Sequence, residues 1–157
     1  MDVISFKILK ILQEKARIPN VEVARQVGLA PSAVLERIRK LEKQGIIEGY
    51  EVRLNPKYFT KSLVAFVTVA TEPGDAGDRA GEALAEIELV QEVHLVAGED
   101  AYLVKLRAAD PQELGWIIRH RIARIGGVQS TRTVIALETV KETARIPIGE
   151  KQRGDLR

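Results

Sequence analysis

The strongest chemical signal in this sequence of 157 residues is a group of cations at helical spacing in its first third. The group consists of Arg37, Arg39, Lys40 and Lys43. Guanidinium and ammonium groups bind phosphate oxygens, and an arginine can also bind a guanine edge through two hydrogen bonds. We expect Arg37 to contact a guanine or a phosphate, and Lys40 and Lys43 to contact phosphates. A solvated basic surface without a partner is the alternative, and the charges alone favour it.

The residues around these cations favour nucleic acid over a solvated surface. Two short helices, over 20–27 and 31–43, are predicted on either side of a tight turn at Gly28. This is the layout of a helix-turn-helix whose second helix enters the DNA major groove. Small residues at the start of the second helix, Ser32 and Ala33, allow its backbone to approach the bases. The predicted DNA contacts are Ser32, Ala33, Glu36, Arg37, Arg39, Lys40 and Lys43.

Local signals define the ends of both helices. Asn20 is the expected cap of the first helix, because its side-chain oxygen can accept a hydrogen bond from an otherwise unpaired backbone N–H. Gly28 is expected to end that helix in a left-handed conformation, and Pro31 suits the first turn of the next helix. Gly45 ends the second helix. The buried side of the second helix is predicted to carry Val34, Ile38 and Leu41.

A further helix and a β-wing complete the predicted N-terminal head. Apolar residues between Ile4 and Leu12 recur at helical spacing and predict a helix that packs against the other two. Residues 46–54 follow as an extended segment of the kind that forms a wing. Residues 1–61 carry a net charge of +5 and residues 62–157 one of −3, so only the front half is suited to nucleic acid.

The second half of the chain follows a different pattern. It predicts strands over 63–71, 90–97, 101–108 and 128–140 and helices over 78–87 and 110–125. The order βαββαβ indicates a ferredoxin-like antiparallel sheet with both helices on one face. The other face stays apolar and is more stable when a second subunit covers it, so we expect a homodimer. Its apolar residues are expected to be Val64, Phe66, Val67 and Val69.

The chain is therefore expected to be an α+β protein in four parts. These are a winged helix-turn-helix head (1–53), a linker (54–61), the ferredoxin-like domain (62–140) and a tail (141–157). Within the tail, residues 145–148 are a candidate edge strand, and residues 149–157 are expected to be disordered or to bind a partner. The sequence has no cysteine, no apolar run that could span a bilayer and no secretory signal. We therefore expect a cytoplasmic protein without membrane contact.

An enzyme is poorly supported by the sequence. The two histidines, His94 and His120, have no cysteine and no serine close in sequence to pair with as base and nucleophile. No spacing suits a metal site, so neither a metal nor a cofactor is predicted.

Four segments, taken in order, resemble the Lrp/AsnC, or feast/famine, family of transcriptional regulators. They are ILKILQEKARIPNVEVARQVGLAPSAVLERIRKLEKQGIIEGY at 8–50, LNP at 54–56, HLVAGEDAYL at 94–103 and GGVQSTRTVIALE at 126–138. The resemblance implies an N-terminal helix-turn-helix and a ferredoxin-like domain often called the regulation-of-amino-acid-metabolism (RAM) domain. It also implies dimers that assemble into tetramers or octamers, and an amino acid bound between dimers.

In this family the effector site lies at the turn between the second and third strands. The corresponding residues here are Gly98, Glu99, Asp100, Ala101 and Tyr102, with Thr131 and Thr133 matching threonines near the same pocket. The glycine, the first acid and the tyrosine match the family pattern, whereas Ala101 replaces a usual aspartate. An amino acid needs an acceptor for its ammonium group and donors for its carboxylate. Acidic residues, backbone N–H groups and threonines could supply both, and a solvated acidic turn is the alternative.

Together these features predict a sequence-specific transcriptional regulator. It would bind double-stranded DNA as a homodimer and respond to an amino acid or a related metabolite. The alternative function is an amino-acid-sensing module whose head mediates protein contacts, and binding of a ligand without any binding of DNA would favour it.

Overall fold

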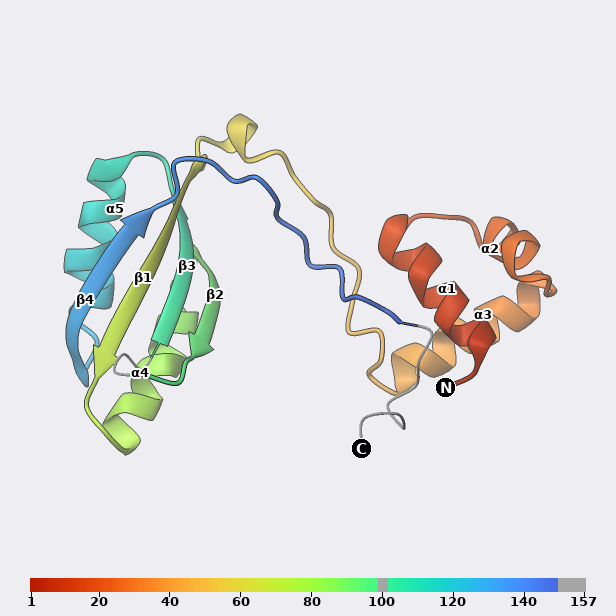
Figure 1. Cartoon of the computed structure of the whole chain (residues 1–157), viewed down its shortest axis with the longest axis horizontal. Helices are drawn as coiled ribbons and strands as arrows, with labels where there is room; N and C mark the ends of the chain where they lie inside the picture. The colour runs from red at the N-terminus through yellow and green to blue at the C-terminus, as the bar shows by residue number, and fades with distance from the viewer. Residues whose placement is uncertain (99–101, 150–157) are drawn as a thin grey trace. The chain divides into compact units, whose positions relative to one another are not determined.

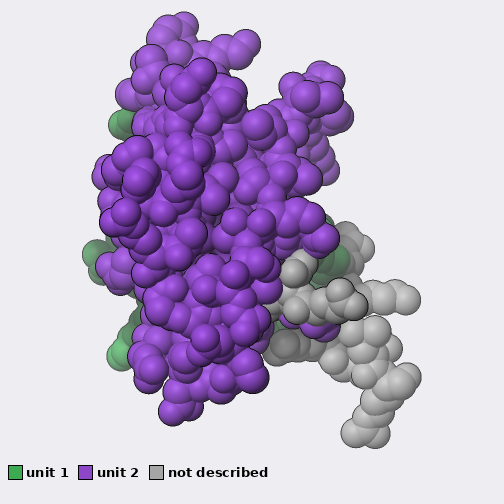
Figure 2. Space-filling model, turned by 90° about the vertical axis from the view of Figure 1, so that its left-hand side faces the viewer, with its two compact units in different colours: residues 1–53, 142–157 green, residues 54–141 purple. Residues whose placement is uncertain are grey.

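The computed structural model describes residues 1–98 and 102–149, which form two compact units (Figure 2). The first unit, the head, contains Met1–Arg53 together with residues 142–149 of the tail. The second unit, the sheet unit, contains Leu54–Lys141. The chain therefore passes from the head to the sheet unit and back again.

Three helices form the head: α1 (Val3–Glu14), α2 (Asn20–Val27) and α3 (Pro31–Lys43) (Figure 1). They share an apolar core in which Ile8, Val23 and Val34 are completely buried. Since each of these residues comes from a different helix, the core joins α1 to the α2–α3 pair. The predicted helix-turn-helix and its supporting helix are confirmed.

The ends of α2 follow the predicted turn chemistry with one exception. Gly28 ends α2 in the left-handed conformation (φ 72°, ψ 36°), which glycine adopts without steric cost. Pro31 occupies the first turn of α3, as predicted. The predicted cap at Asn20 is wrong, because Asn20 is already the first helical residue and Pro19 holds the cap position without a side-chain hydrogen bond. A capping side chain must come from the residue before the helix, where the backbone is still extended.

Two segments predicted as strands form none in the described structure. Residues 46–54, the expected wing strand, and residues 145–148, the expected edge strand, have no strand partner. The tail instead meets α1, where the Gln13 amide donates to the Ile146 carbonyl oxygen (3.1 Å) and accepts from the Ile146 N–H (2.7 Å). One side chain thus satisfies the backbone of Ile146 in place of a neighbouring strand. The expected disorder from residue 150 onward lies outside the described residues.

The sheet unit is built on a four-stranded sheet in the order β2-β3-β1-β4 (Figure 1). In chain order its elements are η1, a 3-10 helix (Pro56–Phe59), β1 (Leu63–Thr71), α4 (Asp75–Ala85), β2 (Val90–Leu95), β3 (Tyr102–Ala108), α5 (Pro111–Ile117), η2, a π-helical turn (Ile118–Ile122), and β4 (Val128–Ile135). All neighbouring strands are antiparallel. The βαββαβ order confirms the ferredoxin-like arrangement.

Some element bounds differ from the prediction. Helix α4 begins three residues earlier than expected, at Asp75, and β2 ends two residues earlier, at Leu95. Strand β4 ends at Ile135 instead of Val140. Ile135 already lies opposite Ala65, close to the first residue of β1, so a β4 that reached Val140 would run past the end of β1, its neighbour among the described strands.

Helices α4 and α5 cover one face of the sheet. Leu84 of α4 and Ile117 of α5 belong to the same buried cluster as Val67 of β1. Since alternate residues of a strand point to opposite faces, Val69 shares this covered face with Val67. The prediction that these two valines lie on the open face is therefore wrong, whereas the alternation leaves Val64 and Phe66 on the open face, as predicted.

Candidate DNA-binding surface and ligand-binding region

The side of α3 opposite the head core is open to a partner. Val34, Ile38 and Leu41 are buried in the head, as predicted. Residues about half a turn away from them in a 3.6-residue helix point to solvent. The exposed residues on this side are Ser32, Glu36, Arg39, Lys40 and Lys43, with Ala33 half-buried beside them. We call this set the α3 face, and it contains six of the seven predicted DNA contacts.

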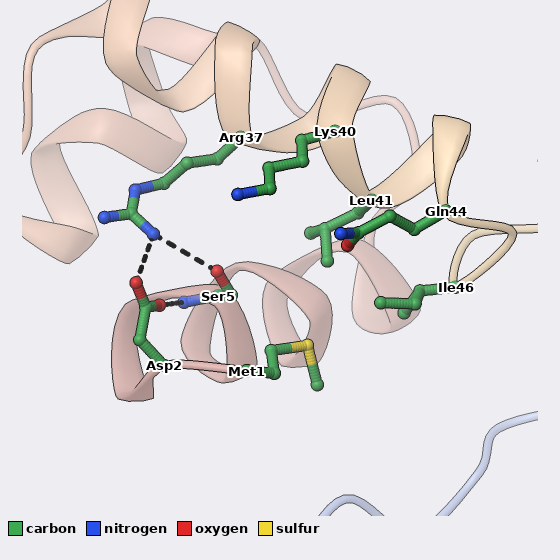
Figure 3. A pocket seen from close by; sticks show the side chains of 8 residues that line it. All are labelled: Met1, Asp2, Ser5, Arg37, Lys40, Leu41, Gln44 and Ile46. Carbon is green, nitrogen blue, oxygen red and sulfur yellow. Dashed lines mark hydrogen bonds and ion pairs between the residues drawn. The ribbon is translucent and has the colours of Figure 1, made fainter.

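Arg37, the seventh predicted contact, points toward the start of α1 (Figure 3). Its Nη1 donates to Asp2 Oδ2 at 2.5 Å and to Ser5 Oγ at 3.3 Å. The Arg37 side chain is 34% exposed and that of Asp2 is 53% exposed. A cavity of about 270 Å³ opens beside this pair, and Lys40 also lines it (Figure 3).

The Asp2 carboxylate has two partners at once. Its Oδ1 accepts the Ser5 N–H at 2.8 Å and so caps α1, while Oδ2 accepts from Arg37. The Ser5 backbone N–H, followed by the Arg37 guanidinium, lowers the pKa of Asp2 far below its usual range, because both groups stabilise the charged form. Asp2 is therefore an anion at neutral pH and links the first turn of α1 to the middle of α3.

Tyr50 ties the segment after α3 back to the end of that helix. Its hydroxyl donates to Glu42 Oε1 at 2.9 Å. Partial burial, followed by the bond to Glu42, raises the pKa of Tyr50 to about 12. The hydroxyl therefore keeps its proton at neutral pH and can hold this contact.

Tyr102, one of the predicted effector-turn residues that match the family pattern, is part of the sheet-unit core. It is 7% exposed, and its hydroxyl donates to the Gly77 carbonyl oxygen of α4 at 3.2 Å. A Cβ added to Gly81 would come within 2.5 Å of the same hydroxyl, so α4 lies directly on the ring. Gly98 is described with φ +141°, whereas Glu99, Asp100 and Ala101 lie outside the described residues.

Thr131 and Thr133 lie on the helix-covered side of β4. They pair with Val69 and Val67 of β1, and both are half-buried. Val69 also pairs with Tyr102, so Tyr102 and Thr131 flank the same valine from opposite sides. Two strand spacings separate their backbones by about 10 Å. The structure therefore places these residues in one row across the sheet without direct contact.

The two histidines lie in separate surroundings. His94 Nε2 is 3.4 Å from Glu92 Oε2 on the open face of the sheet, and the His120 ring lies 5.4 Å from that of Trp116. Among the described residues, no cluster of acidic or histidine side chains could hold a metal ion. Over the same ranges, none of the helices combines the length and apolar character needed to cross a membrane.

Sequence reasoning missed the partners of Arg37 and of Tyr102. An aspartate three residues before Ser5 is a recognisable N-cap signal for α1 and could have identified Asp2 as the cap. The two glycines of α4, Gly77 and Gly81, are four positions apart on one helix face. That spacing could have indicated that the helix backbone lies close to a large side chain. It could not have identified that side chain as Tyr102.

Comparison with known proteins identifies both units. Residues 1–48 match the winged helix-turn-helix DNA-binding model, and residues 64–146 match the Lrp/AsnC ligand binding domain. The leucine-responsive regulatory protein of Klebsiella pneumoniae is 40% identical over 150 residues, which cover 94% of this chain and 92% of that protein.

Solved structures agree with this assignment. A transcriptional regulator of Neisseria meningitidis in complex with L-Met has a TM-score of 0.88 and 28% identity, covering 94% of this chain and 96% of that chain. The leucine response regulatory protein of Mycobacterium tuberculosis has a TM-score of 0.82 and 33% identity, covering 95% of this chain and all of that one (100%). These relatives are regulators of transcription and not enzymes. The chain belongs to the Lrp/AsnC family and is a ligand-modulated, DNA-binding transcriptional regulator.

Proposed function

We propose that the α3 face is the surface that binds double-stranded DNA in the major groove. Ser32 and Ala33 begin the helix and would let its backbone approach the base edges. Arg39, Lys40 and Lys43 follow toward its C-terminal end, where their long side chains suit phosphates. The observation that carries the proposal is that the α3 face is exposed, apart from the half-buried Ala33, while the opposite side of α3 forms the head core.

Salt titration of DNA binding tests this proposal. The DNA-binding constant is expected to fall with salt concentration less steeply in Lys43→Met. The slope of its logarithm against the logarithm of salt concentration should be smaller in magnitude by about 0.9, the value for one lost phosphate contact. Lys57→Met, which removes an exposed lysine of the sheet unit, is the matched control and should leave the slope unchanged. Fluorescence polarisation with DNA from upstream of the protein's own gene is the measurement. Absent or salt-insensitive binding of the native protein would contradict the proposal.

The open face of the sheet supports a homodimer. Phe66 lies directly opposite Val134 of β4, which is 59% exposed, and opposite Lys105 of β3, and Leu103 lies two residue pairs further along β3. Apolar side chains on an open sheet face are more stable when a second copy covers them. A two-fold dimer would also present two α3 faces to a two-fold symmetric DNA site, and tetramers or octamers would be built from it. Phe66→Glu should shift the sedimentation coefficient toward that of a monomer.

The ligand we propose is a free amino acid with an apolar side chain. One relative is leucine-responsive by name, and a similar structure was solved with L-Met. The candidate region runs from Gly98 to Tyr102 and includes Thr131 and Thr133. Calorimetry with leucine, methionine and a charged amino acid, with and without DNA, tests this. A ligand bound by a protein that never binds DNA would favour the alternative, a sensing module whose head contacts proteins.

The proposed location is the cytoplasm. A regulator of transcription acts in the compartment that holds its DNA, and the proposed ligand is a cytoplasmic metabolite.

A further inference from the structure

We propose that Arg37 is a positioning residue, which orients α3 for DNA through Asp2 and does not itself contact DNA. The proposal rests on the proposed role of the α3 face. It assigns one basic residue of the recognition helix to the head's internal structure, and it makes Asp2, on another helix, a determinant of DNA affinity.

The position of Arg37 on the helix separates it from the α3 face. At 100° per residue, Arg37 lies about 70° from the mean direction of Ile38 and Leu41, whereas Arg39 and Lys43 lie on the far side of the helix. Burial agrees, since Arg37 is half-buried and both Arg39 and Lys43 are exposed. Arg37 therefore occupies the flank of α3 that faces α1 (Figure 3).

The partner of Arg37 is itself held in place. Asp2 Oδ1 is fixed by the Ser5 N–H, at 2.8 Å, so that Oδ2 is directed at the guanidinium. Ser5 is the one buried polar residue of the described core, 8% exposed, and its hydroxyl also accepts from Arg37 Nη1. The Asp2 carboxylate, the Ser5 hydroxyl and the Arg37 guanidinium are therefore in contact between α1 and α3.

The charge of Asp2 also argues against a phosphate at this place. A phosphate close to the Arg37 guanidinium would lie within a few ångströms of the Asp2 carboxylate, and like charges at that distance repel. The pair presents no net charge to DNA, whereas Arg39, Lys40 and Lys43 keep theirs. The pair can instead stabilise one angle between α1 and α3, because it joins the N-terminal end of α1 to the centre of the recognition helix.

A double-mutant comparison separates the two roles. Arg37→Met removes the charge and keeps the side-chain length, and Asp2→Asn keeps a good N-cap acceptor while it removes the ion pair. Asp2→Asn also removes a charge that repels DNA, so the diagnostic quantity is the effect of Arg37→Met in the two backgrounds. All proteins are full-length, and circular dichroism confirms that each is folded at the temperature of the binding measurement.

For a positioning residue, we expect Arg37→Met to weaken DNA binding roughly twofold to fivefold in the native background, as an ion pair of this exposure allows. In the Asp2→Asn background Arg37→Met should have no further effect. The slope of log K against log salt should stay unchanged, in contrast to Lys43→Met. A change in affinity with an intact fold is an effect that a merely structural residue would not produce.

Two results would overturn the proposal. One is an equal or larger loss on Arg37→Met in the Asp2→Asn background, which would mark a direct contact with DNA, and a slope lowered by about 0.9 would identify that contact as a phosphate. The other is an affinity unchanged by Arg37→Met. Failure of the native protein to bind DNA would instead contradict the proposed function itself. Arg37→Gln, whose side-chain amide can still donate to Asp2, is the second variant if Arg37→Met does not fold.

Discussion

The head and the sheet unit hold their candidate functional residues in opposite ways. In the head, Ser32, Arg39 and Lys43 are exposed on a helix whose other side is core. In the sheet unit, Tyr102 is buried and bonded to α4. An exposed residue can change without disturbing the packing, whereas a buried ring cannot. If the proposed sites are correct, DNA binding and stability are separable in the head, while ligand response and stability share Tyr102 in the sheet unit.

Tyr102→Ala is expected to have the largest effect, because it tests the buried side of this contrast. Loss of the ring leaves a cavity beneath α4 and should lower the free energy of unfolding of the sheet unit by about 3–5 kcal/mol. Trp116, the single tryptophan of the chain, lies on α5 of the same unit. Its fluorescence during a urea titration is the measurement.

Tyr102→Phe is the matched control. It keeps the ring and loses only the hydrogen bond to Gly77, so we expect a cost of about 1 kcal/mol. If alanine at this position costs no more than phenylalanine, Tyr102 is not a core residue. The contrast between the two units would then fail, and a direct role for Tyr102 in ligand binding would be the better account.

Local sequence rules account for most of the fold. Gly28 and Pro31 have the conformation and position that the sequence predicted, and β1 has the predicted bounds. Asp110 caps α5 by accepting from the Glu113 N–H. Each of these features depends on residues a few positions apart, so the sequence contains the whole signal. The α3 face was predictable for the same reason, since helical periodicity alone separates exposed from buried positions.

Pairings between distant residues could not be predicted in this way. Asp2 and Arg37 are 35 positions apart, and Gln13 and Ile146 are 133 apart. No local pattern encodes such a pair, because it depends on how whole elements pack. The candidate ligand region was proposed only through the family resemblance, because Tyr102 and Thr131 reach the same row of the sheet through the strand order and not through their spacing in the sequence.

Gln13→Ala is expected to have an intermediate effect and tests whether the tail belongs to the head. It removes both hydrogen bonds to Ile146, which should lower the stability of the head by about 1 kcal/mol. The tail should then be cut faster by trypsin after Arg145, the residue before Ile146. Gln26→Ala, which removes a hydrogen bond to Glu22 on α2, is the control. Equal rates of cleavage in the two variants would mean that the tail is not held by Gln13.

The smallest expected effect concerns Glu113, whose place in the sheet unit parallels that of Asp2 in the head. Both carboxylates bind a backbone N–H at the start of a helix and a cation from another segment. Glu113 accepts from Lys61 Nζ and from the Ala109 N–H, each at 2.5 Å. Lys61, followed by this N–H, lowers the pKa of Glu113. About a third of each partner's side chain is exposed (32% and 30%), so solvent screens the pair and its effect is modest.

The sign of the pH dependence follows from that lowered pKa. The contribution of Glu113 to stability is complete above the ordinary glutamate pKa of about 4.3 and is lost as the pH falls through the lower pKa of the folded state. Glu113→Gln removes this contribution at neutral pH, so the variant should lose less stability than the native protein between about pH 6 and about pH 3. Glu88→Gln, which removes an exposed carboxylate of the same unit, is the control and should show the same dependence of stability on pH as the native protein. Thermal unfolding recorded by Trp116 fluorescence is the measurement.

If Glu113→Gln loses as much stability on acidification as the native protein, the pair with Lys61 does not form in solution. The parallel with Asp2 would then be one of position only, and Glu113 would not join α5 to another segment.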